Sequence, residues 1–105
     1  MNDVLARLEA TVAARAGADP ATSYVASLLA KGRPRIARKL GEEAVELIVA
    51  ALAEDRAALV GEAADLLFHL VVLLREAEIP LADVLGELAR REGVSGVAEK
   101  ASRPA

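Results

Sequence analysis

Two pairs of acidic residues have a spacing that would place both carboxylates of each pair on one side of an α-helix. Glu43 and Glu46 are three residues apart, and Glu62 and Asp65 repeat this spacing further along the chain. Aliphatic residues border both pairs, and a partly buried carboxylate is costly unless it binds a proton or a cation. If two helices pair in antiparallel fashion, the four carboxylates meet, and a divalent cation would balance their charge.

Any metal bound by these four residues would be held by oxygen atoms. The chain has no cysteine and a single histidine, and an oxygen donor set is typical of a hard cation such as Mg²⁺, with Mn²⁺ as the alternative. Glu42, next to Glu43, is expected to point further outward and to play a supporting role. The competing interpretation is an ordinary solvated helix surface, on which glutamates three residues apart are common.

A run of basic residues precedes the first acidic pair. Five cations lie between residues 31 and 39 with no acidic residue among them: Lys31, Arg33, Arg35, Arg38 and Lys39. Several stand where a helix is expected to begin, although the positive end of the helix dipole disfavours cations there. Basic side chains and free backbone N–H groups at a helix start form a site for anions, and arginine and lysine are the usual partners of phosphate. The run therefore indicates phosphate binding, with a solvated basic turn as the alternative.

Three further polar residues are candidates for supporting roles at such a site. His69 lies four residues after Asp65, although a lone histidine on an apolar helix is more often a hydrogen-bonded core residue. Ser23 and Tyr24 are able either to cap and pack a helix or to reach a substrate. No cysteine is present and no serine has an evident neighbouring base, so the expected nucleophile is water. Phosphate-binding cations beside metal-binding carboxylates indicate hydrolysis of a phosphoanhydride.

Composition indicates that helices position these residues. Alanine and leucine dominate the sequence and aromatic residues make up only 2 %, which favours helices over strands. Apolar spacing, glycines and prolines predict an all-α fold of about five helices. Their expected ranges are residues 3–16, 23–30, 34–54, 55–78 and 80–91, followed by a polar C-terminal tail over residues 93–105.

The third and fourth expected helices are apolar around most of their circumference. Val45 and Val49 widen the apolar stripe of the third, and the fourth carries leucine or valine on nearly every side. Such helices are central in a fold and need cover on several sides. The remaining helices are too few to cover both, so we expect a helical bundle whose core is completed by homodimerisation.

Length and charge restrict the class of protein. The 105 residues suit a single domain spanning residues 1–105, and the net charge of −3 argues against binding to nucleic acid through its phosphates. No uninterrupted apolar run reaches the roughly 18 residues of a membrane span. Charged residues near the start, namely Asp3, Arg7 and Glu9, give no sign of a signal peptide. We therefore expect a cytoplasmic protein without membrane association.

Four segments of the chain carry a family resemblance. They are SY at residues 23–24, GRPRIARKLGEEAVE at residues 32–46, EAADLLFH at residues 62–69 and SGVAEKASR at residues 95–103. Together they resemble the phosphoribosyl-ATP pyrophosphatases of histidine biosynthesis. The E-E-x-x-E and E-x-x-D patterns alone resemble the wider all-α superfamily of MazG-like nucleoside triphosphate pyrophosphatases. The sequence departs from the family pattern at Phe68, where a tyrosine is expected, and at Glu78, where a glycine is expected.

The resemblance implies Mg²⁺-dependent hydrolysis of phosphoribosyl-ATP between its α and β phosphates. The products would be phosphoribosyl-AMP and pyrophosphate, in the second step of L-histidine biosynthesis. By position, the resemblance assigns metal binding to the two acidic pairs and a supporting acidic role to Glu42. It assigns contact with the polyphosphate of this ATP-derived nucleotide to Lys39 and the nearby arginines. It also implies an all-α fold and assembly as a dimer.

Two other functions fit the same residues. One is a house-cleaning pyrophosphatase of the same superfamily that acts on free nucleoside triphosphates. The other is a helical dimerisation module without catalytic activity, in which the acids bind no metal. A di-iron carboxylate bundle fits less well, because it requires Glu-x-x-His pairs and His69 has Leu66 three residues before it.

Overall fold

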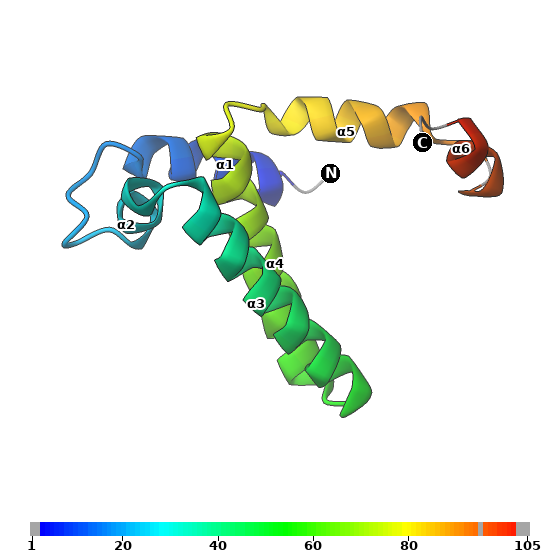
Figure 1. The fold of residues 1–105 in the computed structure, drawn as a ribbon, viewed down its shortest axis with the longest axis horizontal. Coiled ribbons are helices and arrows are strands. Elements are labelled where there is room, and N and C mark those ends of the chain that lie inside the picture. The colour runs from blue at the N-terminus through cyan, green and yellow to red at the C-terminus, as the bar shows by residue number, and fades with distance from the viewer. Residues whose placement is uncertain (1–2, 95, 103–105) are drawn as a thin grey trace.

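The computed structural model describes residues 3–94 and 96–102, and within these ranges every helix or strand that forms is an α-helix (Figure 1). In chain order the helices are α1 (Val4–Arg15), α2 (Tyr24–Lys31), α3 (Arg33–Leu52), α4 (Arg56–Glu76), α5 (Leu81–Arg90) and α6 (Gly96–Ser102). The all-α prediction is therefore confirmed.

Helix α6 adds a short element to the five that the sequence predicts. It lies within residues 93–105, which we expected to form only a polar tail. The segment from residue 96 to residue 102 contains alanine, glutamate and lysine, which are strong helix formers, so local preference explains the extra helix. Two positions of the tail segment that resembles the family, Ser95 and Arg103, lie outside the described residues.

Local signals fix where the helices around the site begin. Ser23 Oγ accepts the N–H of Ala26 at 3.2 Å, and Asp55 Oδ1 accepts the N–H of Ala58 at 3.0 Å. Each cap satisfies a backbone donor that the first turn of α2 or α4 leaves unpaired. Pro34 occupies the first turn of α3, where a residue without an N–H is tolerated. The predicted starts are therefore correct to within one residue.

Two glutamates end the long helices earlier than the apolar periodicity predicts. Glu54 and Glu78 have positive φ angles of 58° and 59°, a left-handed conformation that ends helices and favours glycine. Helix α3 therefore ends at Leu52 rather than at residue 54, and α4 ends at Glu76 rather than at residue 78. Glu78 is also the position at which the family resemblance predicts a glycine.

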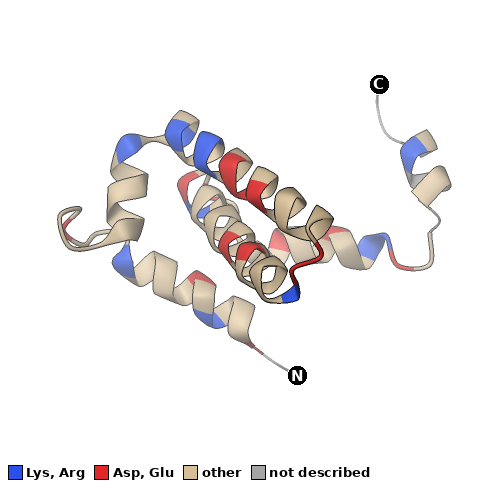
Figure 2. Ribbon diagram, turned by 90° about the horizontal axis from the view of Figure 1, so that it is seen from below, with Lys and Arg blue, Asp and Glu red and all other residues tan. Residues whose placement is uncertain are grey.

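Helices α3 and α4 form an antiparallel hairpin (Figures 1 and 2). Helices α1 and α2 cover one end of this hairpin, and a buried aliphatic cluster lies there. The cluster draws on all four helices and consists of Val12, Val25, Leu28, Ile36, Val71 and Val72. It holds the hairpin at the end where α3 starts and α4 finishes, so the acidic residues lie on the part of the hairpin beyond the core.

The far end of the hairpin has much less cover. Five aliphatic side chains of α3 and α4 are more than half exposed, namely Val45, Ile48, Val49, Leu52 and Val60. Helix α5 extends away from the hairpin rather than along it (Figure 1), and its Leu88 is also more than half exposed. A single copy of the chain therefore leaves a broad apolar surface in contact with water.

Helix α4 is long and apolar enough to cross a membrane, and it is the one helix among the described residues that meets this test of length and composition. The central helix of a soluble bundle passes the same test. Helix α4 also carries two carboxylates, Glu62 and Asp65, near its middle, and it packs along α3. The test therefore carries no argument for membrane insertion.

Candidate metal and phosphate site

Three carboxylates from the two hairpin helices converge on one point. Glu43 of α3 and Glu62 and Asp65 of α4 each offer an oxygen atom, and these atoms all lie within 4.8 Å of one another. Antiparallel pairing brings them together, because the acids of α3 and α4 stand opposite each other (Figure 2) and the two α4 acids are one turn apart. We call this group the acidic triad. It contains three of the four residues that the sequence predicts as metal ligands.

Burial leaves the acidic triad electrostatically unsatisfied. Glu43 is only 5 % exposed, Glu62 is half-buried and Asp65 is exposed. The Oε2 atoms of Glu43 and Glu62 are both buried, and neither has a hydrogen-bond partner. A buried carboxylate oxygen loses its hydration, and without a partner nothing compensates for this loss. The two orphaned oxygen atoms therefore make the acidic triad a candidate cation site.

One ammonium group faces the acidic triad from within the chain. Lys39 Nζ lies 3.4 Å from Glu43 Oε1, one helical turn away. The hydrogen bond to Glu43 raises the pKa of Lys39 above its ordinary value, so this ammonium stays charged at neutral pH. A single positive charge does not balance three carboxylates. The all-oxygen donor set that remains fits a hard divalent cation such as Mg²⁺ or Mn²⁺.

The other two predicted acids lie on α3 outside the triad. Glu42 and Glu46 are both exposed, and together with Lys39 they line a shallow hollow of about 530 Å³. An α-helix turns by about 100° per residue, so Glu46 lies about 60° around α3 from Glu43. Helix α4 covers Glu43 and leaves Glu46 in solvent. The structure thus places Glu46 at the rim of the site rather than in the triad.

Four of the five residues of the basic run separate into two groups, and the fifth, Arg38, is exposed on α3. Arg35 lies one helical turn before Lys39 on the same side of α3. Arg33 instead pairs with Glu76 at the end of α4, with 2.5 Å between Nε and Oε2, and the exposed Lys31 is the last residue of α2. The hairpin explains this division, because the start of α3 lies beside the end of α4. Arg35 and Lys39 are therefore the predicted phosphate-binding residues that lie on the side of α3 carrying Glu46, at the rim of the triad.

His69 has the core role that the sequence allowed for it. It is 4 % exposed, its Nδ1 lies 2.7 Å from the carbonyl oxygen of Asp65, and its Nε2 lies 2.9 Å from Tyr24 Oη. A carbonyl oxygen only accepts hydrogen bonds, so in the neutral ring Nδ1 carries the proton and Tyr24 donates its O–H to Nε2. Both ring nitrogens are thereby engaged. No sequence spacing predicts the Tyr24–His69 bond, because the two residues are 45 positions apart.

The fold and the triad agree with one known enzyme family. The phosphoribosyl-ATP pyrophosphohydrolase family matches residues 5–92 of the chain. The chain belongs to this family. A curated relative from Rhizorhabdus wittichii, named phosphoribosyl-ATP pyrophosphatase, is 67 % identical over 99 % of this chain and 98 % of its own length. Relatives of the same name from Novosphingobium aromaticivorans and Agrobacterium fabrum are 64 % and 58 % identical, over 96 % and 95 % of this chain and 94 % of their own lengths.

Membership of the phosphoribosyl-ATP pyrophosphohydrolase family confirms the hydrolase class and the connection with histidine biosynthesis that the resemblance implied. The match covers both hairpin helices and therefore all three residues of the acidic triad. A helical dimerisation module without activity loses its support, because the relatives carry the name of an enzyme.

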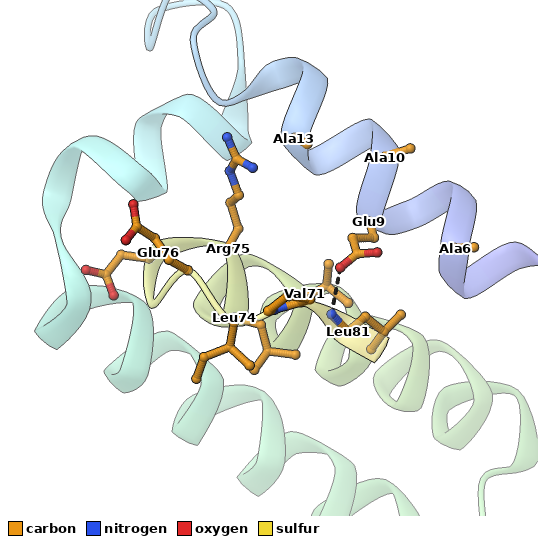
Figure 3. A pocket seen from close by; sticks show the side chains of 12 residues that line it. Ala6, Glu9, Ala10, Ala13, Val71, Leu74, Arg75, Glu76 and Leu81 are labelled. Carbon is orange, nitrogen blue, oxygen red and sulfur yellow. Dashed lines mark hydrogen bonds between the residues drawn. The ribbon is translucent and has the colours of Figure 1, made fainter. Parts of the chain in front are cut away.

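A larger cavity of this pyrophosphohydrolase lies away from the triad. It has a volume of about 640 Å³ and is lined by α1, the end of α4 and the start of α5 (Figure 3). Two of its acids are already engaged, since Glu9 Oε2 accepts the N–H of Leu81 at 2.7 Å and Glu76 pairs with Arg33. The cavity therefore lacks the unsatisfied buried carboxylates that mark the triad. Buried, uncompensated carboxylates are thus a better guide to the candidate metal site than the volume of a cavity.

Proposed function

We propose that this pyrophosphohydrolase cleaves the α–β phosphoanhydride bond of phosphoribosyl-ATP and releases phosphoribosyl-AMP and pyrophosphate, the second step of L-histidine biosynthesis. Water contributes the oxygen atom that forms the new P–O bond, the bridging P–O bond breaks, and protons are released to solvent. The observation that carries the proposal is the pair of buried, partnerless Oε2 atoms on Glu43 and Glu62. The proposal treats residues 1–105 as one catalytic domain.

Glu43, Glu62 and Asp65 would hold Mg²⁺, or Mn²⁺ in its place. Such an ion, when bound, neutralises phosphate charge and makes a water molecule more nucleophilic. Glu46 stands one turn from Glu43 at the open rim, and we propose that it supplies a further carboxylate oxygen when its side chain turns inward. Glu42, which is exposed beside the same hollow, would orient a water molecule rather than bind the ion directly.

The cations on the same side of α3 would bind the polyphosphate. Lys39 already lies against Glu43, so its ammonium is positioned to contact an oxygen of the scissile phosphates. Arg35, one turn earlier, would hold the phosphate further from the metal through its planar guanidinium group. Lys31 and Arg33 would serve at the outer edge, and Arg33 would have to leave Glu76 to do so. Ser23 supports this arrangement by capping α2.

A second copy of the chain is the partner that we propose for the exposed aliphatic surface of the hairpin. The outward-facing side chains of α3 at Val45, Ile48, Val49 and Leu52 form one stripe, which is the pattern of an interface between helices. The net charge of −3 disfavours nucleic acid as the alternative partner. We propose a homodimer located in the cytoplasm. A molar mass in solution equal to that of one chain would contradict the dimer.

A substrate comparison tests the proposed activity. Phosphoribosyl-ATP and a panel of free nucleoside triphosphates are incubated separately with the protein and Mg²⁺, and pyrophosphate release is measured. We expect turnover of phosphoribosyl-ATP that stops when a chelator is added and returns with excess Mg²⁺. Turnover of the triphosphate panel without turnover of phosphoribosyl-ATP would instead indicate the house-cleaning pyrophosphatase. Activity that survives the chelator would contradict the metal site.

A further inference from the structure

Tyr24 is exposed to solvent and is nevertheless held in a fixed position. Tyr24 is 51 % exposed, yet both its hydroxyl and its ring contact other side chains. The hydroxyl lies 2.9 Å from Nε2 of the buried His69. The ring lies nearly parallel to that of Phe68, with 6.0 Å between centroids and 17° between planes. One part of the ring is thus fixed against the protein, and the remainder is open to solvent.

The position of Tyr24 relative to the acidic triad follows from helix geometry. Its two ring neighbours, Phe68 and His69, stand three and four residues after Asp65 on α4, so they lie on the next turn of the helix on the same side. The carbonyl oxygen of Asp65 also contacts His69 Nδ1 directly. The ring of Tyr24 therefore lies about one helical turn beyond the proposed metal ligand.

The packing of the helices places Tyr24 near the phosphate-binding side of the site. Helix α2, which begins at Tyr24, packs against α3, the helix that carries Lys39, and Lys39 itself pairs with Glu43. A substrate whose phosphates lie between Lys39 and the triad would therefore extend past Tyr24. The part of a nucleotide that continues beyond its phosphates is a ribose and a planar base.

A fixed aromatic ring with an open face favours the binding of another planar ring. Immobilising a free side chain costs conformational entropy when a ligand binds. The hydrogen bond to His69 and the stacking on Phe68 already order the Tyr24 side chain, so little entropy remains to be lost on binding. Offset stacking between aromatic rings is favourable beyond the area that it buries. Stacking of a nucleobase on an aromatic side chain changes affinity by about 5- to 160-fold. The described residues hold one tyrosine and one phenylalanine, and both lie at this place.

We propose that the open face of Tyr24 is the stacking surface for the purine base of the substrate, with Phe68 supporting the ring and His69 acting as a positioning residue through the Tyr24 hydroxyl. This inference rests on the proposed function, because it requires a nucleotide whose phosphates lie at the triad. It assigns recognition of the base to α2 and α4 and leaves the chemistry to the acids.

The sequence supplies a direct optical test. The chain has one tyrosine and no tryptophan, so its intrinsic fluorescence comes from Tyr24. We expect AMP, added with Mg²⁺, to quench this fluorescence in a saturable manner, whereas inorganic pyrophosphate, which lacks a base, leaves it nearly unchanged. Parallel titration of N-acetyltyrosinamide corrects for light absorbed by the base. Equal quenching by both ligands, or none by AMP at concentrations that inhibit the enzyme, would overturn the inference.

Kinetics of two substitutions separate the ring from the hydroxyl. Tyr24→Leu removes the stacking surface, so we expect KM for phosphoribosyl-ATP to rise by about tenfold with a smaller change in kcat. Tyr24→Phe keeps the ring but loses the bond to His69, so its KM should rise by at most about threefold. Equal increases in both variants would assign the effect to the hydroxyl and contradict stacking. If Tyr24→Leu does not fold, the fluorescence titration of the unaltered protein decides.

The two proposals fail in different ways. A protein that hydrolyses phosphoribosyl-ATP but shows no base-dependent quenching retains the proposed function and refutes the role of Tyr24. A protein that does not hydrolyse phosphoribosyl-ATP refutes the proposed function, whatever its fluorescence shows.

Discussion

Two glutamates of this chain, Glu87 on α5 and Glu43 on α3, each have a cation within one helical turn. They differ in how deeply they are buried and in how many of their oxygen atoms have partners. Glu87 is partly exposed and accepts hydrogen bonds from Arg90 at 2.7 and 3.1 Å, with Arg91 a further 3.5 Å contact. Glu43 is buried, has a single cation at 3.4 Å and retains an oxygen without a partner.

The difference shows which acids the chain satisfies by itself. On α5, neighbours three and four residues away provide enough positive charge, as on many helix surfaces. In the hairpin, three carboxylates share one ammonium. Buried charge that the chain does not compensate by itself is the property that supports the proposed metal site.

Substitution of the buried acid should have the largest effect. We expect Glu43→Gln to lower the rate of phosphoribosyl-ATP hydrolysis by at least about 100-fold, because it removes a ligand of the proposed metal and the charge that faces Lys39. Glu87→Gln, which changes the same chemical group on α5, should retain nearly full activity. Steady-state assays at saturating Mg²⁺ measure both rates. Comparable losses of activity in the two variants would contradict a special role for Glu43.

Metal addition should stabilise the folded protein through the acidic triad. At a Mg²⁺ concentration ten times its dissociation constant, we expect the free energy of unfolding to rise by about 1.4 kcal/mol. Urea unfolding with and without Mg²⁺ measures the change. Glu43→Gln should show no such increase, and without metal it should be at least as stable as the unaltered protein, because it removes a buried charge. An equal Mg²⁺ effect in both proteins would point to nonspecific binding.

The end of α4 offers a smaller effect that arises from backbone conformation rather than charge. Glu78 adopts a φ of 59°, which is strained for a residue with a Cβ atom and free of strain for glycine. We expect Glu78→Gly to raise the free energy of unfolding by about 0.5–1 kcal/mol. Thermal unfolding followed by circular dichroism measures it, and Glu78→Ala is the matched control because it removes the charge and keeps the strain.

The smallest effect concerns Glu87, the glutamate on α5 whose charge is balanced by neighbouring arginines. The hydrogen bond and charge of Arg90 hold the pKa of Glu87 below its ordinary value. A lowered pKa in the folded state stabilises the fold above the pKa of the unfolded chain, and this contribution is lost as the pH falls through the folded pKa. Arg90→Gln should move the Glu87 pKa upward, as followed by NMR of the side-chain carboxyl group. An unchanged pKa would show that the pairing has no effect in solution.

The features that could be predicted from the sequence are those that depend on local spacing. The Ser23 cap follows from residue type, and the meeting of Glu43 with Glu62 and Asp65 follows from helical periodicity and antiparallel pairing. The outward position of Glu46 could not be predicted, because it depends on how α3 is rotated against α4.

Other features lack a sequence signal for different reasons. The bond between Tyr24 and His69 joins residues 45 positions apart, so it requires the packing of α2 against α4. The early end of α4 depends on a left-handed conformation at Glu78, and a glutamate does not indicate such a conformation as a glycine would. The ion pair of Arg33 with Glu76 depends on the two ends of the hairpin lying side by side.

The engagement of both ring nitrogens of His69 has a consequence for the choice of metal in a cell. Copper, nickel and zinc displace weaker-binding ions wherever imidazole or thiolate ligands are accessible. This chain has no thiol, and its one imidazole is already bound on both sides by Tyr24 and Asp65. A metal bound at the proposed site would therefore be held by oxygen atoms, without the nitrogen or sulfur ligands that favour these borderline ions.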